Sequence, residues 1–136
     1  ALDIQRTGVA TYYIASVDES LAAVLRASGR DVVLIRGMDI LKSIDMGDIS
    51  PEAVYRFARE TVAAAEGADG CLLSCGNWRT LESVTPLEAE FGIPVITSNQ
   101  AGIWQSLRMA DVSTQDVSGG GRLFSLPGKR KQGKIS

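Results

Sequence analysis

The chain has 136 residues, of which 45% are hydrophobic and 22% are charged, with a formal net charge of −2 at pH 7. This length and composition predict one soluble globular domain, and they argue against nucleic-acid and membrane partners. The sequence contains no histidine, which excludes a Ser-His-Asp triad, a Cys-His dyad and most zinc sites.

Short apolar runs and helical patterns alternate from the start of the chain. Residues 9–14 are a β-rich run, and residues 16–19 fit a capping box that would begin a helix. Residues 31–36 predict a second strand that is covered on both faces, because its apolar run is nearly continuous. Residues 37–49 form a long irregular segment, and loops of this length are often functional or partly helical.

The alternation continues in the second half of the chain. A Ser-Pro pair at residues 50–51 predicts a helix start, and residues 70–74 predict the third strand. Gly76 or Asn77 is expected to cap the next helix, which Pro86 would bend or interrupt.

A fourth strand and a last helix follow. Residues 93–97 predict an edge strand, where a proline near the start is tolerable. Residues 98–100 are expected to cap the last helix. Residues 122–124 are a short segment in which apolar residues reappear. We expect residues 1–124 to form the domain and residues 125–136 to be a basic, disordered tail.

This order of elements predicts an α/β fold with a flavodoxin-like, three-layer domain. Helices would cover both faces of a four-stranded parallel sheet in the order 2-1-3-4. Strands one and three are then neighbours at the switch point, where ligands bind beyond the carboxyl ends of the strands. Those two ends carry residues 12–13 and 74–77, so we expect a binding crevice there.

Cys75 is the main catalytic candidate, because it directly follows the third strand. The N-terminus of the next helix would favour its thiolate form, and Gly76 would let a ligand approach the backbone closely. The alternative is that Cys75 only fills space in the core, the role that we expect for Cys71. The two cysteines lie too far apart in a strand to form a disulfide. Two free thiols and the lack of a secretory signal predict a cytoplasmic protein.

Several polar side chains could bind a carboxylate in the same crevice. Asn77 and the backbone N–H groups of Gly76 and Asn77 suit a carboxylate or an enolate, although Asn77 could also be only a helix cap. Ser98 and Asn99 could reach the crevice or serve only as caps. Tyr12 and Tyr13 would face opposite sides of a strand, so at most one is well placed, and periodicity does not choose between them.

Five stretches carry a family resemblance: residues 9–13, 70–81 (GCLLSCGNWRTL), 86–88, 92–101 (GIPVITSNQA) and 121–124. They resemble the C-terminal half of the aspartate/glutamate racemase superfamily, in its maleate cis-trans isomerase and arylmalonate decarboxylase branch. The resemblance implies two similar α/β domains with the active site between them, and no metal or organic cofactor. It also implies that Cys75 is the second-half cysteine, that Tyr13 hydrogen-bonds a substrate carboxylate, and that Asn77 is the polar residue after the cysteine.

We therefore expect a cofactor-independent isomerase of small dicarboxylates, similar to maleate isomerase, with Cys75 as nucleophile or proton donor. The alternatives are an arylmalonate-type decarboxylase, an amino-acid racemase, and a non-catalytic half-domain or assembly module. Because the resemblance covers only the second half of the family, we expect a homo-oligomer or a missing N-terminal half to complete the site.

Overall fold

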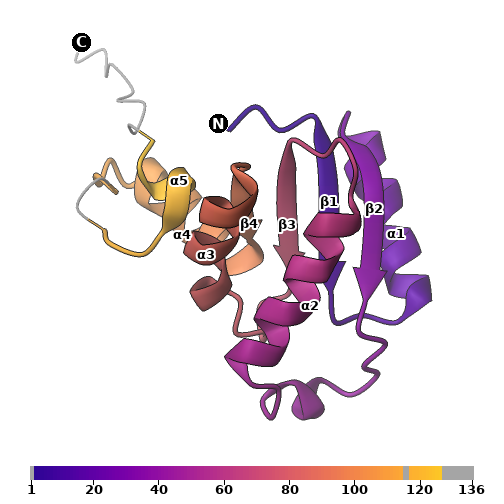
Figure 1. The fold of residues 1–136 in the computed structure, drawn as a ribbon. Helices are drawn as coiled ribbons and strands as arrows, with labels where there is room; N and C mark the ends of the chain where they lie inside the picture. Colours follow the sequence, from indigo (N-terminus) through magenta and orange to yellow (C-terminus); the bar gives the residue numbers. More distant parts are fainter. Residues whose placement is uncertain (1, 115–116, 127–136) are drawn as a thin grey trace.

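The computed structural model describes residues 2–114 and 117–126, which form a four-stranded sheet between two layers of helices (Figure 1). The strand order is β2-β1-β3-β4, and every pair of neighbouring strands is parallel. This topology confirms the fold predicted from the sequence. The strands are β1 (Arg6–Thr11), β2 (Asp31–Gly37), β3 (Gly70–Ser74) and β4 (Val95–Thr97). The helices are α1 (Ala15–Ala27), α2 (Pro51–Ala64), α3 (Leu81–Phe91), α4 (Ser98–Met109) and α5 (Gly121–Phe124), with a short 3-10 helix, η1 (Ser43–Met46).

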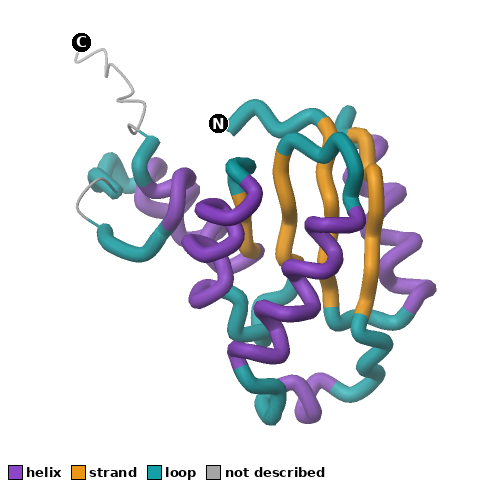
Figure 2. The backbone as a smooth tube through the Cα atoms, viewed as in Figure 1, coloured by secondary structure: helices purple, strands orange, loops and turns teal. Residues whose placement is uncertain are grey.

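The central strand β1 packs against both helix layers. Ala10 belongs to the larger hydrophobic cluster, with Val54 and Ala58 of α2, whereas Val9 belongs to the cluster that contains Ala22 of α1. Neighbouring residues of a strand point to opposite faces of the sheet, which explains this division. Figure 2 shows the strands enclosed between helices, with α2 in front of the sheet and α1 behind it.

Strand β3 follows the same alternation and thereby determines where its last residues point. Cys71, Leu73 and Cys75 all belong to the larger cluster, on the side of α2 and α3, while Leu72 packs against the α1 cluster. The period of two therefore carries Cys75 to the α2 and α3 side of the sheet, just beyond the carboxyl end of β3.

The predicted helix starts were only partly correct. The start of α2 is as predicted, since the Ser50 hydroxyl accepts the Ala53 N–H at 3.2 Å. The capping box at residues 16–19 is wrong, because α1 begins at Ala15 after Ile14, which makes no side-chain cap. The prediction that Gly76 or Asn77 caps α3 is also wrong, because that helix begins at Leu81.

The remaining differences concern β1, β4, α4 and the end of the chain. Strand β1 covers Arg6–Thr11 rather than residues 9–14. Strand β4 begins at Val95 rather than at residue 93. The cap of α4 is Thr97, which forms a capping box with Gln100, one residue before the predicted cap. The expected disordered tail lies mostly outside the described residues, which end at Leu126. Within the ranges 2–114 and 117–126, no helix has the length and apolar character needed to cross a membrane.

Candidate active site at the carboxyl edge of the sheet

Cys75 is the first residue after β3, and it is only 5% exposed. Its Sγ atom accepts a hydrogen bond from the backbone N–H of Asn77 at 3.2 Å. The expected helix N-terminus does not take this role, because residues 76–80 form a separate loop before α3 begins. The donor at the thiol is therefore a backbone amide of this loop, which we call the Cys75 loop.

The Cys75 loop is fixed on two sides. The Asn99 side chain in α4 donates its Nδ2 to the Gly76 carbonyl oxygen at 2.8 Å. Trp78 is 2% exposed and packs edge-on against Phe57 of α2, with ring centroids 6.1 Å apart. These two contacts hold the loop between α4 and α2, so the backbone that follows the thiol has a defined geometry.

Ser98 and Asn99 differ in their relation to the site. Both follow β4 at the carboxyl edge of the sheet, and both are exposed. Asn99 contacts the backbone of the Cys75 loop. Ser98 is the first residue of α4, so its assignment to substrate binding stays a prediction.

Tyr12 and Tyr13 form a bend beyond the end of β1. Their ring centroids lie 4.5 Å apart at an interplanar angle of 54°, so the expectation that they face opposite sides of a strand is wrong. Burial raises the pKa of Tyr12, and the charge of Cys75 and a hydrogen bond to that thiol raise it further. Both tyrosines pack against the hydrophobic cluster that contains Cys75, which the sequence alone did not indicate.

Tyr13 lies beside a depression between α1 and β2, together with Asp18, Gly37 and Asp39. Its proposed contact with a substrate carboxylate came from the family resemblance, and it stays a prediction.

A cavity of about 470 Å³ opens beside the Cys75 loop. Its polar lining includes Asn77 and Asn99, and its apolar lining includes Leu81, Ile103 and Val117. One wall is a glycine-rich segment, residues 117–120, which we call the strap. The volume suits a small organic molecule, and amide groups beside apolar walls suit an organic acid.

Two buried side chains hold the strap and the helix α5 that follows it. Gln100 is 2% exposed, accepts the Thr97 N–H through Oε1 at 3.1 Å, and donates through Nε2 to the Gly120 carbonyl oxygen. Glu88 is 7% exposed and accepts the Arg122 N–H through Oε2 at 2.9 Å. The sequence analysis missed both residues. A Thr-x-x-Gln capping pattern marks Gln100, and the helical stripe that includes Val84 marks Glu88.

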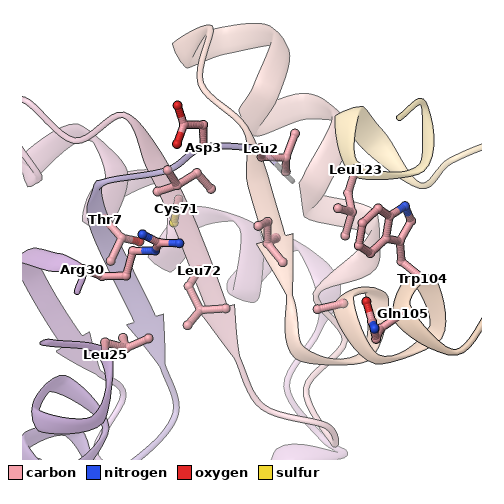
Figure 3. Close-up of a pocket in the computed structure, with 13 residues that line it drawn as sticks. Leu2, Asp3, Thr7, Leu25, Arg30, Cys71, Leu72, Trp104, Gln105 and Leu123 are labelled. Atoms are coloured by element: carbon pink, nitrogen blue, oxygen red, sulfur yellow. The ribbon is translucent and has the colours of Figure 1, made fainter. Parts of the chain in front are cut away.

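A second pocket lies between α1 and α4, away from Cys75, and has a volume of about 360 Å³. Figure 3 shows Leu25 and Arg30 on one side of it and Trp104 on the other. Cys71 lies at its floor, is 1% exposed, and has its pKa raised to about 12 by burial. The prediction that Cys71 is a core residue is therefore confirmed. Among residues 2–114 and 117–126, no three His, Cys, Asp or Glu side chains form a group that could hold a metal ion.

The fold and the site define a class, a three-layer parallel α/β domain with a cysteine at the carboxyl end of its third strand. The sequence profile of arylmalonate decarboxylase matches residues 1–124, and the chain belongs to this family. It is 35% identical over 129 residues to arylmalonate decarboxylase of Bordetella bronchiseptica, covering 91% of this chain and 52% of the relative. It is 33% identical over 125 residues to maleate isomerase of Nocardia farcinica, covering 91% of this chain and 49% of the relative.

Solved structures of the same two kinds of enzyme also match this chain. A crystal structure of arylmalonate decarboxylase matches with a TM-score of 0.82 and 33% identity, over 91% of this chain and 54% of that one. The maleate cis-trans isomerase of Nocardia farcinica, as a cysteine-to-serine variant with a covalently bound succinylcysteine intermediate, matches with a TM-score of 0.83 and 31% identity. That match covers 90% of this chain and 49% of the isomerase. The resemblance to this branch is confirmed, and the chain spans about half the length of the curated relatives it matches.

Proposed function

We propose that this chain carries one half of the active site of a cofactor-independent isomerase that converts small cis-dicarboxylates to their trans isomers. Cys75 is the proposed nucleophile. The observation that carries the proposal is the position of this thiol at the carboxyl edge of the sheet, where it accepts the Asn77 N–H and precedes a loop that lines the cavity. The 33% identity to a maleate isomerase supports the same reaction.

The proposed reaction uses addition and elimination. The Cys75 thiolate forms an S–C bond to one alkene carbon, and the π electrons move to the other carbon and into its carboxylate as an enediolate. Rotation about the new C–C single bond follows. The electron pair then re-forms the alkene in the trans geometry, and the S–C bond breaks to release the thiolate. The related isomerase forms a covalent succinylcysteine in a variant with one cysteine replaced by serine, so its adduct is on another cysteine, and it supports a cysteine adduct as a step of this type of reaction.

The backbone of the Cys75 loop is proposed to bind a substrate carboxylate. N–H groups directed at a developing enediolate stabilise the transition state more than the ground state. Gly76 and Asn77 are both exposed, so a ligand can reach their backbone, and Asn99 keeps the loop in place. Tyr13 and Ser98 complete the proposed binding set.

An arylmalonate decarboxylase is the second candidate. It is favoured by the family match over residues 1–124 and by the apolar wall of the cavity, which contains Leu81, Ile103 and Val117. In that reaction loss of carbon dioxide leaves an enediolate, and the Cys75 thiol gives its proton to the α-carbon. The apolar wall would then hold the aryl group.

We also propose that a second half completes the site, either a second copy of this chain or a separate N-terminal half. Among the described residues, the Cys75 sulfur accepts a hydrogen bond from the backbone N–H of Asn77, which is a donor and takes up no proton. The group that takes up or returns the thiol proton is therefore proposed to come from the other half. Ile44 and Leu41, in the segment that follows β2, are 82% and 76% exposed, and apolar side chains of this kind suit a surface that is covered by a partner.

The test is turnover of maleate and of phenylmalonate by the wild-type chain, with and without a separately produced N-terminal half of a relative. Proton NMR follows fumarate and phenylacetate as products. Cys75→Ser should abolish turnover, whereas Cys71→Ala, the matched control inside β3, should retain it. If the wild type converts neither substrate in either setting, the chain is not an enzyme of this class, and the non-catalytic half-domain replaces the proposal.

Thiol labelling offers a check that needs no substrate. If Cys75 is the proposed nucleophile, iodoacetamide should alkylate it faster than free cysteine at pH 7, because catalytic cysteines are reactive thiols. Labelling no faster than free cysteine would favour a purely structural role for Cys75.

A further inference from the structure

A buried carboxylate, Asp18, lies directly behind the tyrosine bend. It is in the first turn of α1 and is 7% exposed. The Thr11 hydroxyl, at the last residue of β1, donates to Asp18 Oδ1 at 2.6 Å. The same Thr11 oxygen accepts the backbone N–H of Tyr13 at 3.1 Å. Asp18 and Tyr13 are therefore connected through a single hydroxyl group, and Thr11 is itself fully buried.

Gly37, the last residue of β2, closes this arrangement from the other side. A Cβ atom at this position would lie 2.1 Å from the Tyr13 carbonyl oxygen and 2.5 Å from Asp18 Oδ2. It would also lie 3.1 Å from Thr11 Oγ1. Only glycine lets the β2 backbone approach the bend this closely.

The carbonyl groups of the bend are held as well. The Ile40 N–H donates to the Tyr12 carbonyl oxygen at 2.9 Å, and the Asp39 N–H donates to that of Tyr13 at 3.2 Å. Backbone groups of the bend thus meet partners from β1 and from the segment after β2. The side chains of Tyr12 and Tyr13 pack against the hydrophobic cluster that contains Cys75.

We infer that Asp18 is a positioning residue that acts through the Thr11 hydroxyl to fix the Tyr12–Tyr13 bend against Cys75. The carboxylate orients the hydroxyl, because a hydroxyl that donates to Asp18 presents its lone pairs to the Tyr13 N–H. The bend in turn sets the distance of the Tyr12 phenol from the sulfur and the direction of the Tyr13 phenol. The consequence for substrate binding rests on the proposed function, whereas the consequence for Cys75 does not.

A purely local role for Asp18 makes different predictions. An acidic side chain in the first turn of a helix stabilises the helix through the macrodipole. That role requires no hydroxyl at Thr11, and changes at Thr11 would then alter stability without altering the site. Two matched pairs separate the readings: Thr11→Val against Thr11→Ser, and Asp18→Ala against Asp18→Asn. The second member of each pair keeps the hydroxyl or the acceptor oxygen.

Two measurements on the full chain need no substrate. Amide hydrogen exchange at Tyr13 should accelerate roughly fivefold in Thr11→Val, the equivalent of about 1 kcal/mol for one hydrogen bond, and should stay near wild type in Thr11→Ser. The rate of Cys75 alkylation by iodoacetamide should change in Thr11→Val and Asp18→Ala and return toward wild type in Thr11→Ser and Asp18→Asn. If both members of each pair behave alike in these two measurements, the inference is overturned.

Kinetics extend the test to the substrate. For maleate, Thr11→Val should raise KM about fivefold with a smaller change in kcat, because a displaced bend weakens substrate binding by about one hydrogen bond. Thr11→Ser should restore KM. A lower melting temperature in Thr11→Val with an unchanged KM would contradict the inference. If the wild-type chain shows no turnover, the proposed function is refuted. The amide-exchange and alkylation measurements, which need no substrate, then decide whether Asp18 is a positioning residue. If Thr11→Val does not fold, the Asp18 pair gives the same decision.

Discussion

Glu88 joins α3 to two other elements, and its replacement gives the sharpest prediction for stability. Its Oε1 accepts the Val95 N–H at the start of β4 at 3.0 Å, and its Oε2 accepts the Arg122 N–H of α5 at 2.9 Å. A hydrogen bond to a charged group contributes about 1.5 to 3 kcal/mol. The bond to buried Val95 can take the whole of this range, and the bond to Arg122, an exposed residue, takes its lower end. Glu88→Ala should therefore lower the free energy of unfolding by about 3 to 4.5 kcal/mol.

Urea denaturation followed by circular dichroism measures this change. Glu88→Gln keeps one acceptor oxygen and should lose about half as much. The control is Glu90→Gln on the same helix, where an exposed ion pair predicts a loss of less than about 1 kcal/mol. If Glu88→Ala costs no more than this control, the carboxylate does not hold β4 and α5. Because α5 continues from the strap, Glu88→Ala should also loosen the wall of the cavity beside the Cys75 loop.

Three further predictions concern other parts of the chain. Cys71, with its pKa raised to about 12 by burial, should be alkylated by iodoacetamide only after unfolding, and mass spectrometry showing label there in the native protein at pH 7 would refute its core role. Asn99→Ala removes the donor to the Gly76 carbonyl, and it should raise amide exchange in the Cys75 loop about fivefold, the value for one hydrogen bond. A hydrogen bond from Arg59 lowers the pKa of Glu90 below its usual 4.5, so this pair stabilises the fold above that pH and the effect disappears as the pH falls through the lowered pKa. Arg59→Gln should therefore reduce the melting temperature more at pH 7 than at pH 3, and an equal reduction at both would contradict this.

The sheet could be predicted because the sequence pattern that indicates it extends over most of the chain. Four apolar runs separated by helical patterns allow few topologies once crossovers are right-handed, and the order 2-1-3-4 is the one observed. The position of Cys75 followed from the same signal, since the apolar run of β3 ends at Ser74. Both predictions depend on the spacing of hydrophobic residues along the chain, and this spacing does not depend on individual capping or turn residues.

Helix starts were less predictable, because tertiary contacts compete with local capping. Ser16 and Glu19 fit a capping pattern, but α1 begins at Ala15, before either of them, and turns Asp18 toward the Thr11 hydroxyl. No local pattern marks that contact, because it joins a helix to a strand and depends on the absence of a side chain at Gly37. The Tyr12–Tyr13 bend escaped prediction for the same reason.

The helix start at Leu81 changes which group faces the thiol. A thiol at a helix N-terminus would receive the field of a whole helix, whereas Cys75 accepts one backbone N–H from the loop that follows it. An N–H donor stabilises sulfur that carries negative charge. In the proposed reactions, that charge would be present on Cys75 before addition in an isomerase and after proton transfer in a decarboxylase. The proposed half-site therefore suits either reaction, and we expect the choice between them to depend on the half that faces it across the crevice.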